Sequence, residues 1–201
     1  MVFFMIRSLG IILKRNNPTK QVFSILDHLE GVMVCSIARE DIYIGASIEY
    51  TIRNQRTWLV ADEVEMIGMP YVEQYTDLLL LHSVLEICSL CMPAGSLTPG
   101  VFEHVQRLYD DSVVIRLRTS VVKKIFLCKL FALLGFYPQE KKFQNKFFHS
   151  LITESLDNLW AFWVSMVQEK DIEEWLKSCI AMHTQEQKFK TMVISEWVEI
   201  L

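Results

Sequence analysis

The hydrophobic pattern of this 201-residue chain changes near residue 69. Before that point, short segments rich in Val, Ile and aromatic residues are separated by turn-forming residues. The segment SIEYTIRN alternates best and places Ile48, Tyr50 and Ile52 on one face of a strand. Predicted strands cover residues 5–15, 21–31, 31–39, 46–54 and 55–67. So many short strands in a brief stretch favour a small closed barrel, because closure leaves no strand edge unpaired.

From residue 70 onward the pattern is helical. Thr76 and Asp77 are predicted to cap the first helix, and Gly135 with Pro138 to end the third. Predicted helices cover residues 78–91, 100–111, 112–134, 148–168, 171–184 and, as a short last one, 193–201. The expected fold class is therefore α+β with two domains: a five-stranded barrel over residues 1–69 and an all-α helical bundle over residues 70–201.

The third predicted helix is apolar nearly all round, which is typical of a helix at the centre of a bundle. Basic residues nevertheless lie along it, with Arg116 and Lys123 on one seam and Arg118 and Lys129 on another. Each of them fits a snorkelling side chain, with its stem packed and its charge in water, as well as it fits ligand contact.

Charge is unevenly distributed along the chain, although the formal net charge is only −4. The C-terminal part is acidic, whereas the stretch from residue 116 to 146 holds eight basic residues and the single acid Glu140. The basic residues are Arg116, Arg118, Lys123, Lys124, Lys129, Lys141, Lys142 and Lys146. We expect a nucleic acid or an acidic peptide tail to bind there, with a solvated charged face as the alternative.

The barrel segment also carries cations that could contact DNA phosphates. These candidates are Arg7, Lys14, Arg15, Lys20, Arg39, Arg53 and Arg56. Tyr43, Tyr50 and Trp58 are possible platforms for stacked bases, although core packing is the commoner use of an aromatic residue. Eight acidic residues up to Met69 weaken the case for the barrel.

Motifs for catalysis or metal binding are missing from the sequence. Cys88 and Cys91 form one CxxC pair, but a zinc site needs four ligands and no second pair follows. Neither a phosphate-binding glycine motif nor a nucleophile elbow is present, so we expect no enzyme activity, no metal and no cofactor. Five cysteines without framework spacing favour reduced thiols and a cytoplasmic protein, and no apolar run is long enough for a membrane span.

Three segments together resemble the bacterial RecO recombination-mediator and DNA-repair proteins. FLCKLFALLGFYP, residues 126–138, resembles their helix that ends in a leucine-rich Leu-Leu-Gly-Phe/Tyr-x-Pro signature. EQYTDLLLLHSVLEICSLCMPAG, residues 73–95, is similar to the helix that opens their second domain, and SLGIILKR, residues 8–15, resembles their first strand. The three occur in the family's order, and the order of a small barrel followed by a helical bundle matches the family along nearly the whole chain.

The resemblance implies an N-terminal OB-fold and a C-terminal helical domain. It also implies binding of single- and double-stranded DNA, strand annealing, and work with RecR and the acidic C-terminal tail of single-stranded-DNA-binding protein to load recombinase after DNA damage. Two departures matter: residues 139–150 hold no cysteine, where many members carry a zinc-binding cluster, and residues 38–41 read Ala-Arg-Glu-Asp instead of a basic loop. They direct the binding hypothesis toward residues 116–146.

The alternative is a protein-interaction adaptor whose basic helical surface binds an acidic tail with little DNA affinity. An enzyme with an unrecognised site is a third, weaker hypothesis.

Overall fold

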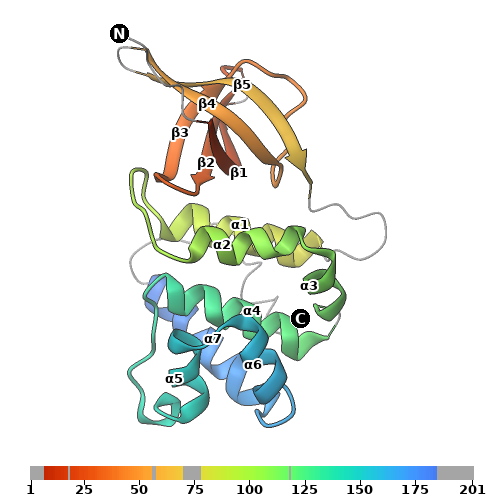
Figure 1. The fold of residues 1–201 in the computed structure, drawn as a ribbon. Helices are drawn as coiled ribbons and strands as arrows, with labels where there is room; N and C mark the ends of the chain where they lie inside the picture. Colours follow the sequence, from red (N-terminus) through yellow and green to blue (C-terminus); the bar gives the residue numbers. More distant parts are fainter. Residues whose placement is uncertain (1–6, 18, 56–57, 70–77, 118, 185–201) are drawn as a thin grey trace. The chain divides into compact units, whose positions relative to one another are not determined.

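The computed structural model of the protein describes residues 7–17, 19–55, 58–69, 78–117 and 119–184. Strands come first and helices follow, as the sequence predicts (Figure 1). The predicted caps Thr76 and Asp77 and the predicted helix over residues 193–201 lie outside the described residues. Among those residues, none of the helices combines the length and the apolar character that crossing a membrane requires.

Five strands close into a barrel in the order β1-β2-β3-β5-β4, with β4 paired back onto β1. They are β1 (Arg7–Asn17), β2 (Val22–Asp27), β3 (Gly31–Ile37), β4 (Ser47–Gln55) and β5 (Trp58–Gly68). Only β3 and β5 pair in parallel; the other neighbours are antiparallel. This is an OB-like barrel, so the predicted fold class of barrel followed by helices is confirmed.

A buried carboxylate ties three strands of the barrel together. Asp27 has no exposed surface, and its carboxylate accepts hydrogen bonds from the Ser8 hydroxyl at 2.5 Å and the Tyr50 hydroxyl at 2.6 Å. It also accepts the backbone N–H groups of Leu29 and Glu30, each at 2.8 Å, which fixes the turn between β2 and β3. Burial raises the pKa of Tyr50, and its hydrogen bond to Asp27 raises it further, so this phenol stays a neutral donor.

One detail of the predicted alternation in β4 is wrong. Ile48 and Tyr50 are fully buried as predicted, but Ile52 is exposed and Thr51 is buried in its place. The register between β4 and β5 shifts between Glu49 and Thr51, beside Glu63, whose φ is +52°. An irregularity of this kind inserts an extra residue and changes which side chains face inward.

Helices α1 (Leu78–Cys91) and α2 (Val101–Gln106) and the short 3₁₀ helix η1 (Arg107–Tyr109) belong with the barrel. Helix α1 packs against β1. The Val32 N–H donates to the Ser96 carbonyl at 3.1 Å, and the Tyr109 hydroxyl donates to the Gly45 carbonyl at 2.6 Å. The first compact unit therefore includes these helices and ends at Val114. The boundary predicted between residues 69 and 70 coincides with the end of the strands.

The second compact unit runs from Ile115 to Leu201, and α3 spans the point of division. Its helices are α3 (Asp111–Arg116), α4 (Ser120–Leu133), the 3₁₀ helix η2 (Lys141–Phe143), α5 (Lys146–Thr153), α6 (Leu156–Trp163) and α7 (Glu169–Thr184). Two predicted long helices, 112–134 and 148–168, are each broken in two. Thr119 and Ser155 adopt extended backbone at the breaks, and the Ser155 hydroxyl accepts the Asn158 N–H at 3.3 Å to start a new helix.

Helix α4 is the centre of this unit, as its sequence predicts. It contacts α5, α6 and α7, and every residue from Lys124 to Phe131 is buried. The predicted stop is confirmed: Gly135 takes a φ of +85°, and the Phe136 N–H returns to the Phe131 carbonyl at 2.9 Å.

Candidate functional site

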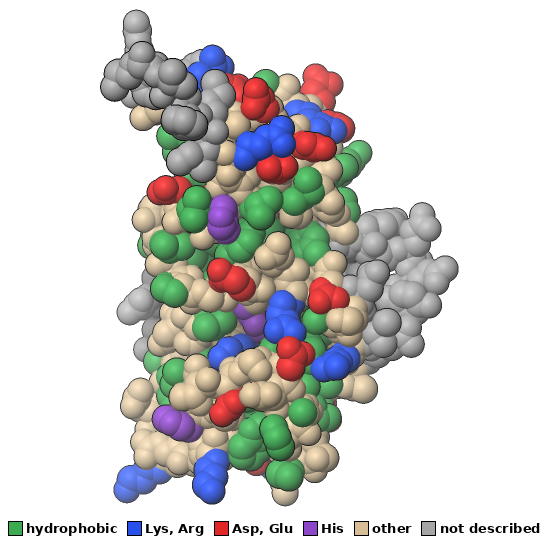
Figure 2. Space-filling view, in the orientation of Figure 1, with side chains coloured by type: hydrophobic (Ala, Val, Ile, Leu, Met, Phe, Trp, Pro, Cys, Tyr) green, Lys and Arg blue, Asp and Glu red, His purple; other side chains and the backbone are tan. Residues whose placement is uncertain are grey.

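Three of the barrel's candidate arginines are paired with carboxylates. Arg7 contacts Glu49 at 3.2 Å, Arg53 contacts Asp62 at 2.7 Å, and Arg39 holds Asp41 through two hydrogen bonds. The bond from Arg39 holds the pKa of Asp41 below its usual value. Figure 2 shows basic and acidic side chains interspersed over the barrel. At each of these arginines a phosphate would compete with a carboxylate that is already bound.

The hairpin formed by β1 and β2 is different. Lys14 of β1 and Lys20 of the turn are exposed and form no ion pair with any residue that the structure describes. Arg15 is exposed as well, with its guanidinium 5.5 Å from the centre of the Phe23 ring. Residues 1–26 contain four basic residues and no acidic one, a local bias that the chain-wide charge count conceals. We call Lys14, Arg15 and Lys20 the basic hairpin.

The turn of the basic hairpin has a fixed shape. The Asn17 side chain accepts the backbone N–H groups of Thr19 and Lys20, both at 3.0 Å. These bonds close an Asx-type turn and hold the backbone that carries Lys20.

Strand pairing places the basic hairpin at the same end of the barrel as the turn between β4 and β5. One row of paired residues runs across the sheet through Asn17, Val22, Ser36, Val60 and Arg53. OB-folds bind oligonucleotides on the face of strands 2 and 3, between the loops that follow strands 1 and 4. The candidate Arg56 belongs to the second of these loops and lies outside the described residues.

The predicted stacking aromatics are placed differently from one another. Tyr50 lies in the barrel core and offers no surface to a base. Tyr43 is 58% exposed, in the connection between β3 and β4. The Trp58 side chain lies outside what the structure describes. Of the three aromatic residues, Tyr43 is therefore the one that the described part of the structure leaves exposed for a base to stack on.

In the helical unit, Lys124 is an internal ion-pair partner. The residue is 3% exposed, and its Nζ lies 2.6 Å from Glu169 and 2.7 Å from Glu173, both on α7. Burial alone would lower the pKa of Lys124, but the two glutamate bonds more than offset it and raise that pKa. Lys124 is one of the predicted binding residues, and in the structure its charge joins α4 to α7.

Lys129 is also turned inward. Its Nζ donates to the carbonyl oxygens of Leu151 at 2.6 Å, Ile152 at 3.4 Å and Glu154 at 2.9 Å. Burial lowers the pKa of Lys129, and the charge of Glu154 partly opposes this. An external ligand could reach neither Lys124 nor Lys129 without breaking these contacts.

Further residues of the predicted basic segment have partners. Lys142 contacts Glu140 at 3.2 Å and Glu174 at 3.1 Å, so this predicted binding residue already has two acidic partners. Arg116 lies 3.4 Å from Asp157, with its guanidinium 5.9 Å from the centre of the Trp160 ring. Lys123 is half-buried, and Arg118 lies outside the described residues.

Lys141 and Lys146 are the members of the segment that remain exposed without an ion pair to a described residue. Lys146 lines a pocket of about 380 Å³ between the exposed side of α5 and the chain that follows α4. We call it the α5 pocket; its lining residues are Tyr137, Gln144, Asn145, Lys146, His149 and Ile152. Sequence reasoning missed Tyr137 and His149, because their approach to Lys146 depends on the path of the chain after Gly135.

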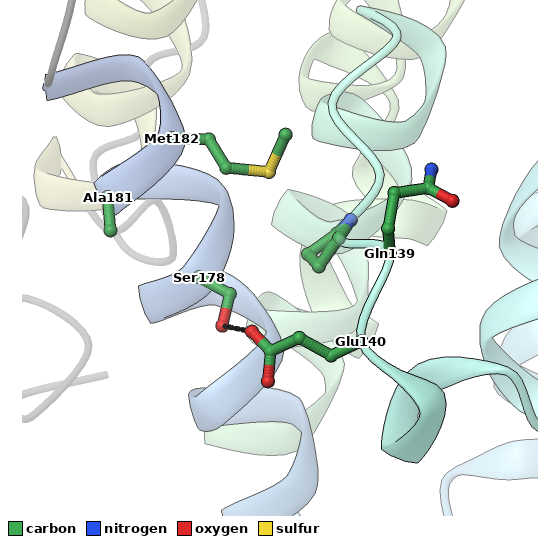
Figure 3. A pocket seen from close by; sticks show the side chains of 6 residues that line it. Gln139, Glu140, Ser178, Ala181 and Met182 are labelled. Atoms are coloured by element: carbon green, nitrogen blue, oxygen red, sulfur yellow. Dashed lines mark hydrogen bonds between the residues drawn. The ribbon is translucent and has the colours of Figure 1, made fainter.

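A second pocket, of about 520 Å³, lies between α7 and residues 138–140 (Figure 3). Glu140 reaches across it and accepts a hydrogen bond from the Ser178 hydroxyl at 3.1 Å, and the Met182 side chain extends from α7 (Figure 3). Its lining includes a carboxylate and no basic side chain, so it does not favour an anionic ligand.

The CxxC pair lies in α1. Cys88 is buried and Cys91 half-buried, and burial raises the pKa of Cys91 to about 12, so both thiols stay protonated at neutral pH. Across the described ranges, no three His, Cys, Asp or Glu side chains gather in a group that could hold a metal ion.

Two surfaces therefore remain as candidate sites, the basic hairpin on the barrel and the α5 pocket on the helical unit. Each offers exposed cations, so both suit anionic ligands. A scan against models of known protein families finds none that matches this chain. A search of curated proteins likewise finds no match.

Proposed function

We propose that this chain is a RecO-like DNA-repair mediator. It binds single- and double-stranded DNA without reading sequence, promotes annealing of complementary strands, and catalyses no reaction. With a RecR-like partner it helps load recombinase onto DNA coated with single-stranded-DNA-binding protein. The observation that carries the proposal is the closed OB-like barrel with a basic hairpin at the end where such barrels bind oligonucleotides. The barrel followed by helices, and the stop of α4 at Gly135, support the RecO resemblance.

The mechanism is electrostatic. Cations of the basic hairpin hold phosphates, and each bound phosphate releases counterions from the DNA. Binding is therefore insensitive to sequence and falls steeply as salt is added. Strands held on one protein surface meet more often than strands free in solution, which is how a protein without a catalytic site speeds annealing.

The test is the affinity for labelled single-stranded DNA in the unmutated chain and in the double variant Lys14→Glu, Lys20→Glu. We expect the variant to bind at least about tenfold more weakly and its salt slope to fall by about two, one for each phosphate that the variant no longer binds. The matched control is Arg39→Gln, which removes a barrel cation that is already paired with Asp41 and should leave DNA affinity within about twofold. Equal DNA affinity in the double variant and the unmutated chain would reject the basic hairpin as the site.

A mediator of this kind works in the cytoplasm. All five cysteines are free and four of them are buried, which suits a reducing compartment.

The α5 pocket favours a second candidate function, that of an adaptor for an acidic peptide tail such as the one on single-stranded-DNA-binding protein. Lys146 and His149 line the pocket, and Ile152 and the Tyr137 ring add apolar surface. A peptide that carries carboxylates beside a hydrophobic side chain fits both features. This function needs no DNA affinity of the chain itself.

The adaptor is tested by titrating a labelled acidic peptide with an apolar C-terminal residue. Lys146→Glu should weaken binding by at least about tenfold, because it both removes a cation and adds a repelling charge. Lys170→Glu makes the same charge change at an exposed position of α7 outside the pocket lining, and should change affinity by less than about threefold. Equal weakening by the two variants would mean that the pocket is not the site.

A further inference from the structure

Helix α5 ends in an unusual way. Its C-cap is Glu154, and the next residue, Ser155, is already the N-cap of α6. A helix commonly ends at a glycine in the left-handed conformation. The N–H groups of that glycine and of the residue after it then donate to the last carbonyls of the helix. Here both residues of the turn are extended, so that arrangement is missing.

Lys129 supplies the missing donors from another helix. Within α5, the Ser150 carbonyl accepts the Glu154 N–H at 2.8 Å. The carbonyls of Leu151 and Ile152, and that of Glu154 beyond them, accept from the Nζ of Lys129 on α4. Lys129 is 8% exposed, so water cannot readily replace its ammonium group as the donor to these carbonyls. A single buried ammonium thus satisfies three carbonyls at the corner between α5 and α6.

The same helix carries the α5 pocket on its other side. Phe147, Phe148 and Leu151 are buried, whereas Lys146, His149 and Ile152 line the pocket. Ile152 is thus both a lining residue and one whose carbonyl Lys129 holds. Movement of the end of α5 would displace this wall of the pocket.

We infer that Lys129 is a positioning residue: it fixes the end of α5 from inside and thereby sets the shape of the α5 pocket, without contacting the ligand. The part of this inference that concerns ligand affinity rests on the proposed acidic-peptide site. The part that concerns α5 does not.

The experiment compares Lys129→Met with Lys124→Met in the full chain. Both variants remove a buried lysine of α4, but the ion pairs of Lys124 are with Glu169 and Glu173 on α7. Lys124→Met therefore controls for a general loss of stability. Hydrogen exchange of the amides in residues 147–154 reports on α5, and titration with the acidic peptide reports on the pocket.

In Lys129→Met we expect the α5 amides to exchange at least about tenfold faster, because the carbonyls of Leu151, Ile152 and Glu154 lose a donor and the first of these bonds is buried. Peptide affinity should fall by about the same factor, and Lys124→Met should leave both measurements within about threefold of the unmutated chain. Lys129→Gln keeps an N–H donor on a shorter side chain, so its α5 amides should exchange at a rate between those of the unmutated chain and Lys129→Met. This variant replaces Lys129→Met in the comparison if the Met variant does not fold.

Unchanged α5 exchange in the Lys129 variants would overturn the inference, and so would equal acceleration by Lys124→Met. If the unmutated chain does not bind the acidic peptide, the adaptor function fails, but faster exchange confined to α5 would still establish that Lys129 fixes this helix.

Discussion

At the scale of single residues, two buried polar side chains, Asp27 and Lys129, bond to partners about 20 residues or more away along the chain. Asp27 accepts from Ser8 and Tyr50, and Lys129 donates to three carbonyls of the corner after α5. A buried charge without partners is expensive, so each of these groups constrains the elements around it.

Tyr50→Phe should destabilise the chain by about 1.5–3 kcal/mol, because it removes a buried hydrogen bond to a carboxylate. The matched variant is Tyr109→Phe, which removes a bond to the neutral Gly45 carbonyl and should cost about 0.5–1.5 kcal/mol. Urea unfolding of the two variants provides the measurement. A larger loss in Tyr109→Phe than in Tyr50→Phe would contradict the assigned role of Asp27.

At the scale of elements, a charge cluster joins α4 to α7, whereas aromatic packing joins α5 to α7. Lys124 bonds to Glu169 and Glu173, and the Ser120 hydroxyl also donates to Glu169. Elsewhere Trp175 of α7 stacks on Phe148 of α5, with ring centres 5.8 Å apart. The aromatic contacts do not titrate, whereas the charge cluster does.

The cluster predicts a pH dependence. Hydrogen bonds from Lys124 and then Ser120 hold the pKa of Glu169 below its ordinary value. The ionised Glu169 therefore contributes its full stabilisation above the ordinary glutamate pKa of about 4.3. This contribution is lost as the pH falls through the lowered pKa that Glu169 has in the folded protein. Glu169→Gln should cost up to about 1 kcal/mol at pH 7, because this side chain is partly exposed, and progressively less below about pH 4.

Unfolding midpoints across the acid range test this dependence. Asp171→Asn, at an exposed position of the same helix, serves as the control and should show little change at any pH. If the loss of stability caused by Glu169→Gln stayed constant down to acid pH, the pairing of Glu169 with Lys124 would be contradicted.

The elements themselves follow largely from local pattern. All five strands and the stop of α4 at Gly135 were predictable, because alternation and turn residues act over a few positions. The breaks at Thr119 and Ser155 were missed, since apolar residues continue across both and only the cap geometry reveals them. The exposure of Ile52 was missed because it depends on the register of β4 against β5.

At the scale of the whole molecule, counting charge along the sequence identified only in part which cations stay exposed without an acidic partner. Of the basic segment from residue 116 to 146, Lys124, Lys129 and Lys142 proved to have partners that lie between 2 and 49 residues away. Lys14 and Lys20 of the barrel, in contrast, face solvent in a part of the sequence without acids. Apart from Glu140, these partners come together only through the tertiary fold, so sequence reasoning could name the cations but could not tell which ones stay available.

We propose that this chain binds DNA through phosphate contacts, and the salt dependence of its affinity for single-stranded DNA is the decisive measurement. We expect binding at about 50 mM salt, with an affinity that falls log-linearly as salt rises and does not depend on base sequence. No binding at that salt concentration, or an affinity that salt leaves unchanged, would contradict it.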